Sequence, residues 1–224
     1  MSPPVGPAGI VQCNGDDHDE YVEAPAPRLF HASASYSVFG SDLSVDAKDA
    51  FMERRAVTAG LSYRFGEKIT GQIGAGATLG GRFVFADTRF SLDPGWIVSA
   101  GATYRLLGGA GTDWFVLMGG AVAASGGVTR DAADRAEDMY AIDLRLTAIA
   151  GRTFFDVLSP YLVGRAFGGP ILWRYDGRER LGTDKYHFQI GAGLLVTLPA
   201  HFDVFAEAVP LGERAAVAGA GYSF

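Results

Sequence analysis

Charged and polar side chains lie inside segments that are otherwise apolar at every second position, and these side chains are the first candidates for chemistry. Carboxylates and an imidazole can act as general acids and bases, and the candidates of this kind are Asp143, Asp203, Glu207 and His187. Guanidinium groups and an amide accompany them, namely Arg64, Arg105, Arg145 and Gln189. Carboxylates beside arginines also form interior ion pairs or a charged constriction that selects ions. Because no nucleophile with a positioned histidine accompanies Asp203 and Glu207, the sequence favours an ion-pair network over a catalytic site.

The segments that carry these residues have a two-residue period, which is typical of β-strands with one apolar and one polar face. We predict ten strands, at residues 28–39, 56–65, 69–79, 96–106, 113–125, 140–151, 160–174, 185–196, 202–210 and 216–224. Their polar faces carry Ser, Thr, Gln and Gly rather than the Lys and Glu of a water-facing sheet, which suits a confined interior. Strands of soluble sandwiches alternate as well, so the period alone does not identify a membrane protein.

The connections between the predicted strands and the placement of aromatic residues favour a membrane barrel. Long polar connections alternate with short turns, and the long ones cover residues 40–54, 80–95, 126–139 and 175–184. Aromatic residues favour the ends of the apolar faces, as expected at the two interfaces of a bilayer; they include Trp96, Tyr104, Tyr186, Tyr222 and Phe224. Together these features predict an all-β fold: a closed antiparallel transmembrane β-barrel of about ten strands, with eight or twelve as alternatives. The long loops would lie outside, and the short turns and both termini inside.

One local signal competes with this strand count. Gly80-Gly81 is typical of a tight hairpin, which would make residues 82–90 a separate strand. We interpret the segment as a protruding part of the second long loop.

The last nine residues, Ala216 to Phe224, again alternate and end on an aromatic residue. A sheet can cross hydrocarbon only if its first and last strands pair and leave no open edge. The segment resembles the C-terminal signature of bacterial outer-membrane β-barrel proteins, with Phe224, Tyr222, Ala220, Ala218 and Ala216 at alternate positions. The resemblance implies an outer-membrane location, contact with outer-membrane lipid, and recognition by the barrel-assembly machinery. The three alanines depart from it, since bulkier residues are common there.

Residues 1–27 precede the barrel, which we place at residues 28–224. They are rich in Pro, Gly and acids and have neither a helical nor a strand period, so we predict a flexible leader. The leader holds the only cysteine, Cys13, and an acidic run from Asp16 to Glu20 that is more typical of a solvated patch than of a metal site. The resemblance implies a secretion signal, which this sequence lacks, so we expect either that the chain begins after processing or that its true start lies upstream.

Composition excludes several classes of protein. The net charge of −6 gives no basic stripe for phosphate backbones, so no nucleic acid is expected as a partner. A single cysteine excludes an internal disulfide and a cysteine-based metal site. No uncharged stretch reaches the roughly 18 residues of a membrane helix. The sequence predicts neither a cofactor nor a metal.

The favoured function is that of a structural protein or a narrow pore for ions and small solutes, because a barrel of this size has little room inside. Inward glycines such as Gly74, Gly76, Gly191 and Gly193 leave space for a narrow water path. The same space would accept a plug, formed by the leader or by a partner protein in the lumen.

Two other functions stay open. One is an outer-membrane hydrolase: His31 and Ser33 resemble the His-x-Ser of lipid A deacylases, and Asp143 with His187 resembles the Asp-His pair of outer-membrane aspartyl-type proteases. The alternation points His31 and Ser33 inward, whereas the catalytic face of the deacylases looks towards lipid, so the sequence favours a role without catalysis. The other is a surface binding or adhesion barrel that uses its acidic outer loops.

Overall fold

The computed structural model describes residues 29–109 and 112–224, and most of them are in β-strands. The strands are β1 (Phe30–Val45), β2 (Lys48–Phe65), β3 (Ile69–Phe85), β4 (Thr88–Leu92), β5 (Gly95–Gly109), β6 (Thr112–Arg130), β7 (Ala136–Arg152), β8 (Leu158–Gly168), β9 (Ile171–Tyr175), β10 (Arg178–Asp184), β11 (Phe188–Thr197), β12 (Phe202–Leu211) and β13 (Arg214–Ser223). A single turn of 3-10 helix, Pro199–His201, joins β11 to β12. Within the described ranges, no helix is long and apolar enough to cross a membrane.

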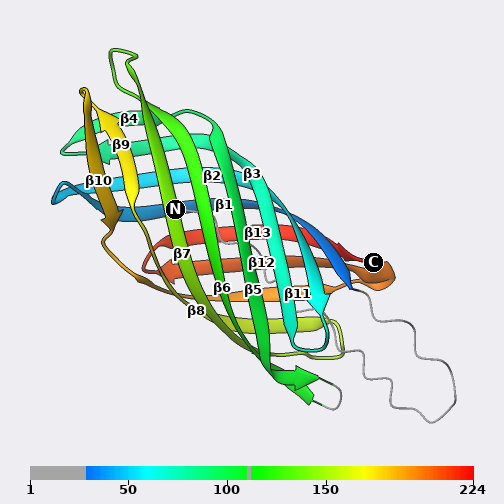
Figure 1. The fold of residues 1–224 in the computed structure, drawn as a ribbon. Coiled ribbons are helices and arrows are strands. Elements are labelled where there is room, and N and C mark those ends of the chain that lie inside the picture. The colour runs from blue at the N-terminus through cyan, green and yellow to red at the C-terminus, as the bar shows by residue number, and fades with distance from the viewer. Residues whose placement is uncertain (1–28, 110–111) are drawn as a thin grey trace, which may run out of the picture.

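Ten of these strands form a closed antiparallel ring in the order β1-β2-β3-β5-β6-β7-β8-β11-β12-β13 (Figure 1). The ring closes where β13 pairs with β1, from His31 opposite Ser223 to Gly40 opposite Arg214. Beyond this ladder, the backbone groups of Phe30 and Phe224 exchange two hydrogen bonds, of 3.1 and 2.9 Å. The predicted closed barrel of about ten strands is confirmed, and its last strand leaves no open edge.

The prediction of four long loops is wrong, because these segments form regular hairpins. β1 and β2 continue to a two-residue turn at Asp46-Ala47, and β3 passes through Gly80-Gly81 and turns only at Ala86-Asp87 to enter β4. Positive φ at both turn residues matches the hairpin turns whose twist suits paired strands. Hairpins satisfy the backbone hydrogen bonds that an irregular loop would leave to water, so the ladders continue to the hairpin turns.

The extended strands close a second ring, of eight strands, in the order β1-β2-β3-β4-β6-β7-β9-β10, with β10 returning to β1. We call this second ring the hairpin ring and its side of the molecule the hairpin end. The opposite side, where β1 begins and β13 ends, is the terminal end. In Figure 1, β4, β9 and β10 lie at the hairpin end, far from the C-terminus.

The predicted strand at residues 160–174 is split into β8 and β9 by Gly169-Pro170. Pro170 has no N–H to donate to a ladder. A side chain at position 169 would lie 1.9 Å from the carbonyl oxygen of Ile142, so only glycine fits this close approach. At this break the pairing changes: β8 pairs with β11, whereas β9 pairs with β10.

The outer face of the ten-stranded ring is an apolar belt. Large exposed aliphatic side chains cover it, among them Leu61, Ile73, Val122, Ile142, Leu144, Leu162 and Ile190. At the terminal end aromatic rings pack against one another along the rim, as Phe30, Tyr63 and Phe65 do. Towards the hairpin end the first outward charges follow, at Asp42, Arg55 and Arg214. A continuous apolar belt bounded in this way is the surface that a barrel presents to lipid.

Candidate functional site: the barrel interior

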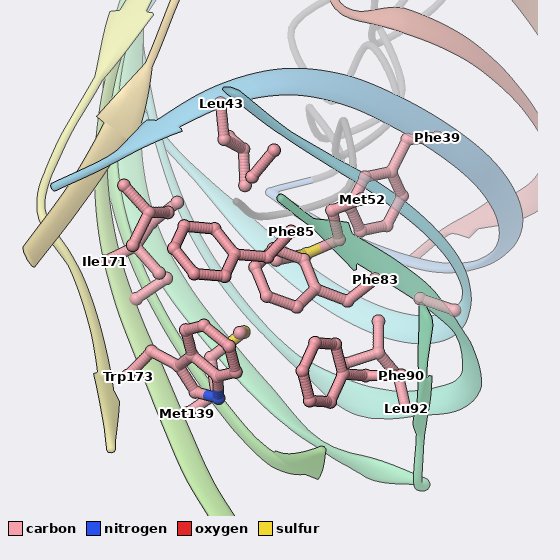
Figure 2. Close-up of a cluster of buried hydrophobic side chains, with 14 of the residues drawn as sticks. Phe39, Leu43, Met52, Phe83, Phe85, Phe90, Leu92, Met139, Ile171 and Trp173 are labelled. Atoms are coloured by element: carbon pink, nitrogen blue, oxygen red, sulfur yellow. The ribbon is translucent and has the colours of Figure 1, made fainter. Parts of the chain in front are cut away.

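The hairpin ring is filled by a cluster of apolar side chains that we call the hairpin core. Its members are Phe39, Leu43, Met52, Phe83, Phe85, Phe90, Leu92, Met139, Ile171 and Trp173, and none is more than 5 % exposed. Figure 2 shows them converging on the axis of the ring from several strands. These side chains occupy the interior of the hairpin ring as one buried apolar cluster.

Trp173 of β9 lies at the centre of the hairpin core. Its ring meets those of Phe83, Phe85 and Phe90 edge to face, at centroid distances of 4.9, 5.3 and 5.2 Å, and stacks on Tyr175 at 4.7 Å. The indole N–H donates a 2.9 Å hydrogen bond to the hydroxyl of Thr129. The only polar side-chain atom of Trp173 therefore has a hydrogen-bond partner, and its ring connects β9 to β3 and β4.

A network of charged side chains lies where the short strands β8, β11, β12 and β13 end beneath the β9–β10 hairpin. Arg145 donates to Asp143 at 2.9 Å and lies 3.4 Å from Glu213 in the β12–β13 turn. The amide of Gln189 also donates to Glu213. Three charged side chains and one amide, from three separate segments, are thus paired with one another in a buried site, as buried charges require.

A second buried ion pair joins Arg165 of β8 to Glu207 of β12 at 2.6 Å. The hydroxyl of Tyr161 donates to the same carboxylate at 3.2 Å. Gly193 lies between these strands, and a side chain there would collide with the ring of Tyr161 at 2.2 Å. The space at Gly193 is therefore taken up by an aromatic ring and does not form a water path.

A third pair lies nearer the terminal end, where Nε2 of His31 is 2.8 Å from Oδ2 of Asp203. His31 faces inward, with its other ring nitrogen buried and without a hydrogen-bond partner in the described part of the chain. An imidazole held by a carboxylate is half of a nucleophile-activating arrangement. Ser33 follows on the same inward face, but no hydrogen bond between it and His31 occurs in the structure.

The structure brings some of the predicted interior residues together and separates others. Asp143, Arg145 and Gln189 belong to one network, whereas Asp203 and Glu207 have different partners. Arg64 on β2 and Arg105 on β5 are half-buried near the terminal end. His187 lies outside the strands, exposed, and its Nδ1 is 3.2 Å from the carbonyl oxygen of Phe167. The predicted interface aromatics are all exposed, namely Trp96, Tyr104, Tyr186, Tyr222 and Phe224.

Sequence reasoning missed Glu213, Arg165 and the whole hairpin core. Glu213 lies in a turn, where no period indicates which way a side chain points. Arg165 lies on a strand whose inward face is bulky and apolar beside it, with Tyr161 and Val163. Across residues 29–109 and 112–224, no three His, Cys, Asp or Glu side chains gather as metal ligands would.

One side of the barrel interior keeps partly accessible side chains, unlike the opposite side. These side chains point inward from β1, β2, β3 and β5, and we call them the inner wall. The inner wall comprises Ser33, Ser35, Thr58, Thr70, Gln72, Ser99, Thr103 and Arg105. An inward side chain of a closed barrel can be reached only through an open end. Since the hairpin core fills the other end, the inner wall is reached from the terminal end.

Arg54 of β2 is a buried cation beside the hairpin core. It is 3 % exposed, its Nη2 lies 3.6 Å from the sulfur of Met139, and its Nε has no hydrogen-bond partner. Burial lowers the pKa of Arg54 to about 10, so the side chain is still charged at neutral pH.

We expect Arg54→Met to raise the free energy of unfolding by about 1–3 kcal/mol, because the variant removes a desolvated charge and keeps an unbranched side chain against Met139. Urea unfolding of the refolded barrel measures the change. Arg55→Met is the matched control, since Arg55 points outward and is exposed. A loss of stability in Arg54→Met alone would show that the guanidinium has a stabilising partner.

Comparison with known proteins rests on structure, because no protein-family model and no curated protein matches the chain. The translocator domain of the autotransporter NalP from Neisseria meningitidis is similar, with a TM-score of 0.53 and 13% identity over 90% of each chain. An outer membrane channel from Pseudomonas putida has a TM-score of 0.50 and 10% identity, over 92% of this chain and 99% of that one. At such identities the likeness concerns the fold.

Both of these proteins carry the barrel fold that the strand order and the apolar belt describe here. A ring that presents aliphatic side chains outward and keeps its charges paired inside has the surface of a membrane-spanning barrel. The chain therefore has a closed β-barrel fold similar to that of these outer-membrane proteins.

Proposed function

We propose that this outer-membrane barrel is a sealed structural protein, which anchors the hairpin ring in the membrane and does not conduct. The hairpin core carries the proposal, because ten apolar side chains that are at most 5 % exposed fill the ring through which any solute would have to pass. The buried ion pairs support it, since they hold the interior of the neighbouring strands in fixed contacts. Of the two roles expected from the fold, pore and structural protein, the interior packing favours the second.

The charges of the hairpin ring argue against an adhesion surface that depends on unpaired acids. Arg180 binds Asp46 at 2.9 Å, and Lys185 binds Asp49 at 2.6 Å. In the β6–β7 hairpin, backbone N–H groups of Arg135 and Ala133 donate to Asp131 and lower the pKa of that carboxyl group. These acids are engaged within the ring, so a cationic ligand would have to displace an existing partner.

Planar-bilayer recording tests the proposal directly. We expect the purified wild-type barrel to give no discrete conductance steps. A variant with Phe83, Phe85, Phe90 and Trp173 all changed to serine should conduct, because the hairpin core would then be polar and loosely packed. Gel mobility of the unheated protein shows whether the variant is folded. Regular steps from the wild-type protein would overturn the sealed barrel and favour a narrow pore.

A further inference from the structure

The apolar belt is hollowed where the last strands of the chain cross it. The neighbouring strands β11, β12, β13 and β1 (Figure 1) carry a groove of about 550 Å³ on their outer face. Small outward side chains form its floor, and larger ones stand at its edges. The floor consists of Ala192, Ala206, Ala208, Ala216 and Ala218, and the edges consist of Tyr36, Val38 and Leu194. The alanines that depart from the C-terminal signature are thus part of a shaped surface.

The register of the strands joins these alanines into one continuous floor. In one row Tyr36 lies opposite Ala218, which in turn lies opposite Ala206. In the next row Val38 lies opposite Ala216. The Cβ atoms of opposite residues in neighbouring strands are only about 4.5–5.5 Å apart. A methyl group stands out less from a sheet than the leucine and isoleucine side chains of the remaining belt, so the floor lies below its surroundings.

Two arginines lie at the end of the groove that faces the hairpin ring. Arg55 of β2 lies opposite Val38. Arg214 of β13 lies opposite Gly40, one outward position further along β1. Both arginine side chains are exposed, and neither has an ion-pair partner in the described parts of the chain. The groove therefore ends at two cations that are available to a ligand.

The outward carboxylates nearby do not neutralise these two arginines through a contact. Glu53 is paired with Arg82 at 2.8 Å. Asp42 lies next to Lys185, whose backbone N–H donates to the carbonyl oxygen of Asp42 at 3.0 Å. Positive charge therefore predominates at this end of the groove.

An apolar groove with cations at its end matches the chemistry of a phosphorylated lipid. Guanidinium groups bind phosphate oxygens through charge-assisted and often bidentate hydrogen bonds. An acyl chain needs an apolar surface, and a sunken floor of methyl groups lets the chain contact the barrel along its length. Basic residues at a membrane surface also attract anionic lipids. Each half of such a ligand thus has a matching half of this surface.

A second copy of the chain fits the same groove less well. Two barrels in one membrane share their orientation, so a twofold axis between them would run parallel to the barrel axis. Each copy would then place its two arginines at the same height as those of the other copy. Like charges repel one another, most strongly in apolar surroundings, which disfavours this contact. A lipid phosphate brings the opposite charge.

We propose that this groove is a binding site for a phosphorylated lipid, with the phosphate between Arg55 and Arg214 and an acyl chain along the alanine floor. The inference rests on the membrane location that the proposed function assumes. It does not depend on whether the barrel conducts, because the groove lies on the outer face.

Titration with two lipids tests the role of the arginines. The full-length barrel in detergent is titrated with phosphatidic acid or with zwitterionic phosphatidylcholine, and mass spectrometry of the intact complexes gives the dissociation constants. We expect one phosphatidic acid to bind about tenfold more tightly, because only its headgroup carries a net negative charge. Arg55→Gln with Arg214→Gln should abolish this preference. Arg89→Gln with Arg174→Gln is the matched control, since it removes two exposed arginines of the hairpin ring.

Filling the groove tests the contact with the acyl chain. Ala208→Leu with Ala216→Leu should weaken the binding of phosphatidic acid about tenfold without any change of charge. Ala100→Leu with Ala102→Leu, on the outer face of β5, is the matched control and should leave the binding unchanged. Glycerol phosphate has an anionic headgroup but no acyl chain, so it should not compete at the concentrations at which the lipid binds.

Three results would overturn the lipid site: equal affinities of the wild-type protein for the two lipids, an unchanged preference after loss of both arginines, or competition by glycerol phosphate, which would indicate a site for free phosphate. A wild-type dimer that Ala208→Leu with Ala216→Leu abolishes would instead assign the groove to a second copy. Mobility of the unheated variants on gels shows that they are folded. Conductance is measured independently, so a failure of the sealed barrel would be distinguishable from a failure of this site.

Discussion

Replacing Trp173 with alanine is expected to lower the free energy of unfolding of the barrel by about 3–5 kcal/mol, the range for removal of a buried aromatic side chain. Trp173 is 1 % exposed and makes close ring contacts with Phe83, Phe85 and Phe90. These contacts come from β3 and β4, so loss of the indole also disconnects β9 from the far side of the hairpin ring. Denaturant unfolding of the protein refolded in detergent measures the effect.

Two further variants separate packing from polarity at this position. Trp173→Phe keeps an aromatic ring but loses the hydrogen bond to Thr129. Loss of that bond should lower the free energy of unfolding by about 1 kcal/mol, and the smaller ring should add a packing loss that is smaller than in Trp173→Ala. Trp96→Ala removes the same side chain from the outer face, where Trp96 is 47 % exposed, and should cost much less. Equal losses for Trp96→Ala and Trp173→Ala would contradict a central role for Trp173 in the hairpin core.

The barrel could be predicted from the sequence, but the hairpin core was not, although a signal for it exists. In β1 the apolar positions are even-numbered up to Val38, and from Phe39 to Val45 they are odd-numbered. The outward face is apolar inside the membrane, whereas beyond it the outside meets water and the inside must be apolar. The phase change therefore marks the edge of the apolar belt in β1. Residues 40–54 carry many polar and charged side chains, which favour a loop and mask this change of phase.

The ion pairs were only partly predictable for a different reason. Period two places a residue inside or outside the barrel, so Asp143, Arg145 and Glu207 could be placed on one side of a sheet. It does not give the stagger between neighbouring strands, which decides which inward residues meet. Asp203 and Glu207 lie on the same inward face of β12, and from the sequence they could share one site. In the structure Asp203 pairs with His31 of β1, whereas Glu207 pairs with Arg165 of β8.

The Arg165–Glu207 pair is the place where loss of a single charge should have the largest effect in the interior. Both side chains are buried, and their atoms are 2.6 Å apart. Glu207→Leu leaves Arg165 as an unpaired charge in a water-excluded site and should lower the free energy of unfolding by about 3–5 kcal/mol. Removal of both charges, in Arg165→Met with Glu207→Leu, should recover most of that loss, because replacing a whole buried pair by apolar side chains is often neutral. Urea titrations of the two single variants and the double variant complete the cycle.

Burial, rather than distance, should determine how much the Arg165–Glu207 ion pair contributes to the free energy of unfolding. The hairpin ring offers a control pair with almost the same distance between its charged atoms. Arg82 and Glu53 are 2.8 Å apart but lie on the outer surface, with Arg82 largely exposed. Water screens such a pair, so Glu53→Leu should change the free energy of unfolding by less than about 1 kcal/mol. Suppose that Glu207→Leu lowered the free energy of unfolding as little as Glu53→Leu does. Water would then have to reach Arg165 from inside the barrel, and accessible side chains would extend beyond the inner wall to the side that holds this ion pair. The comparison of these two carboxylates therefore measures how dry the interior of the barrel is.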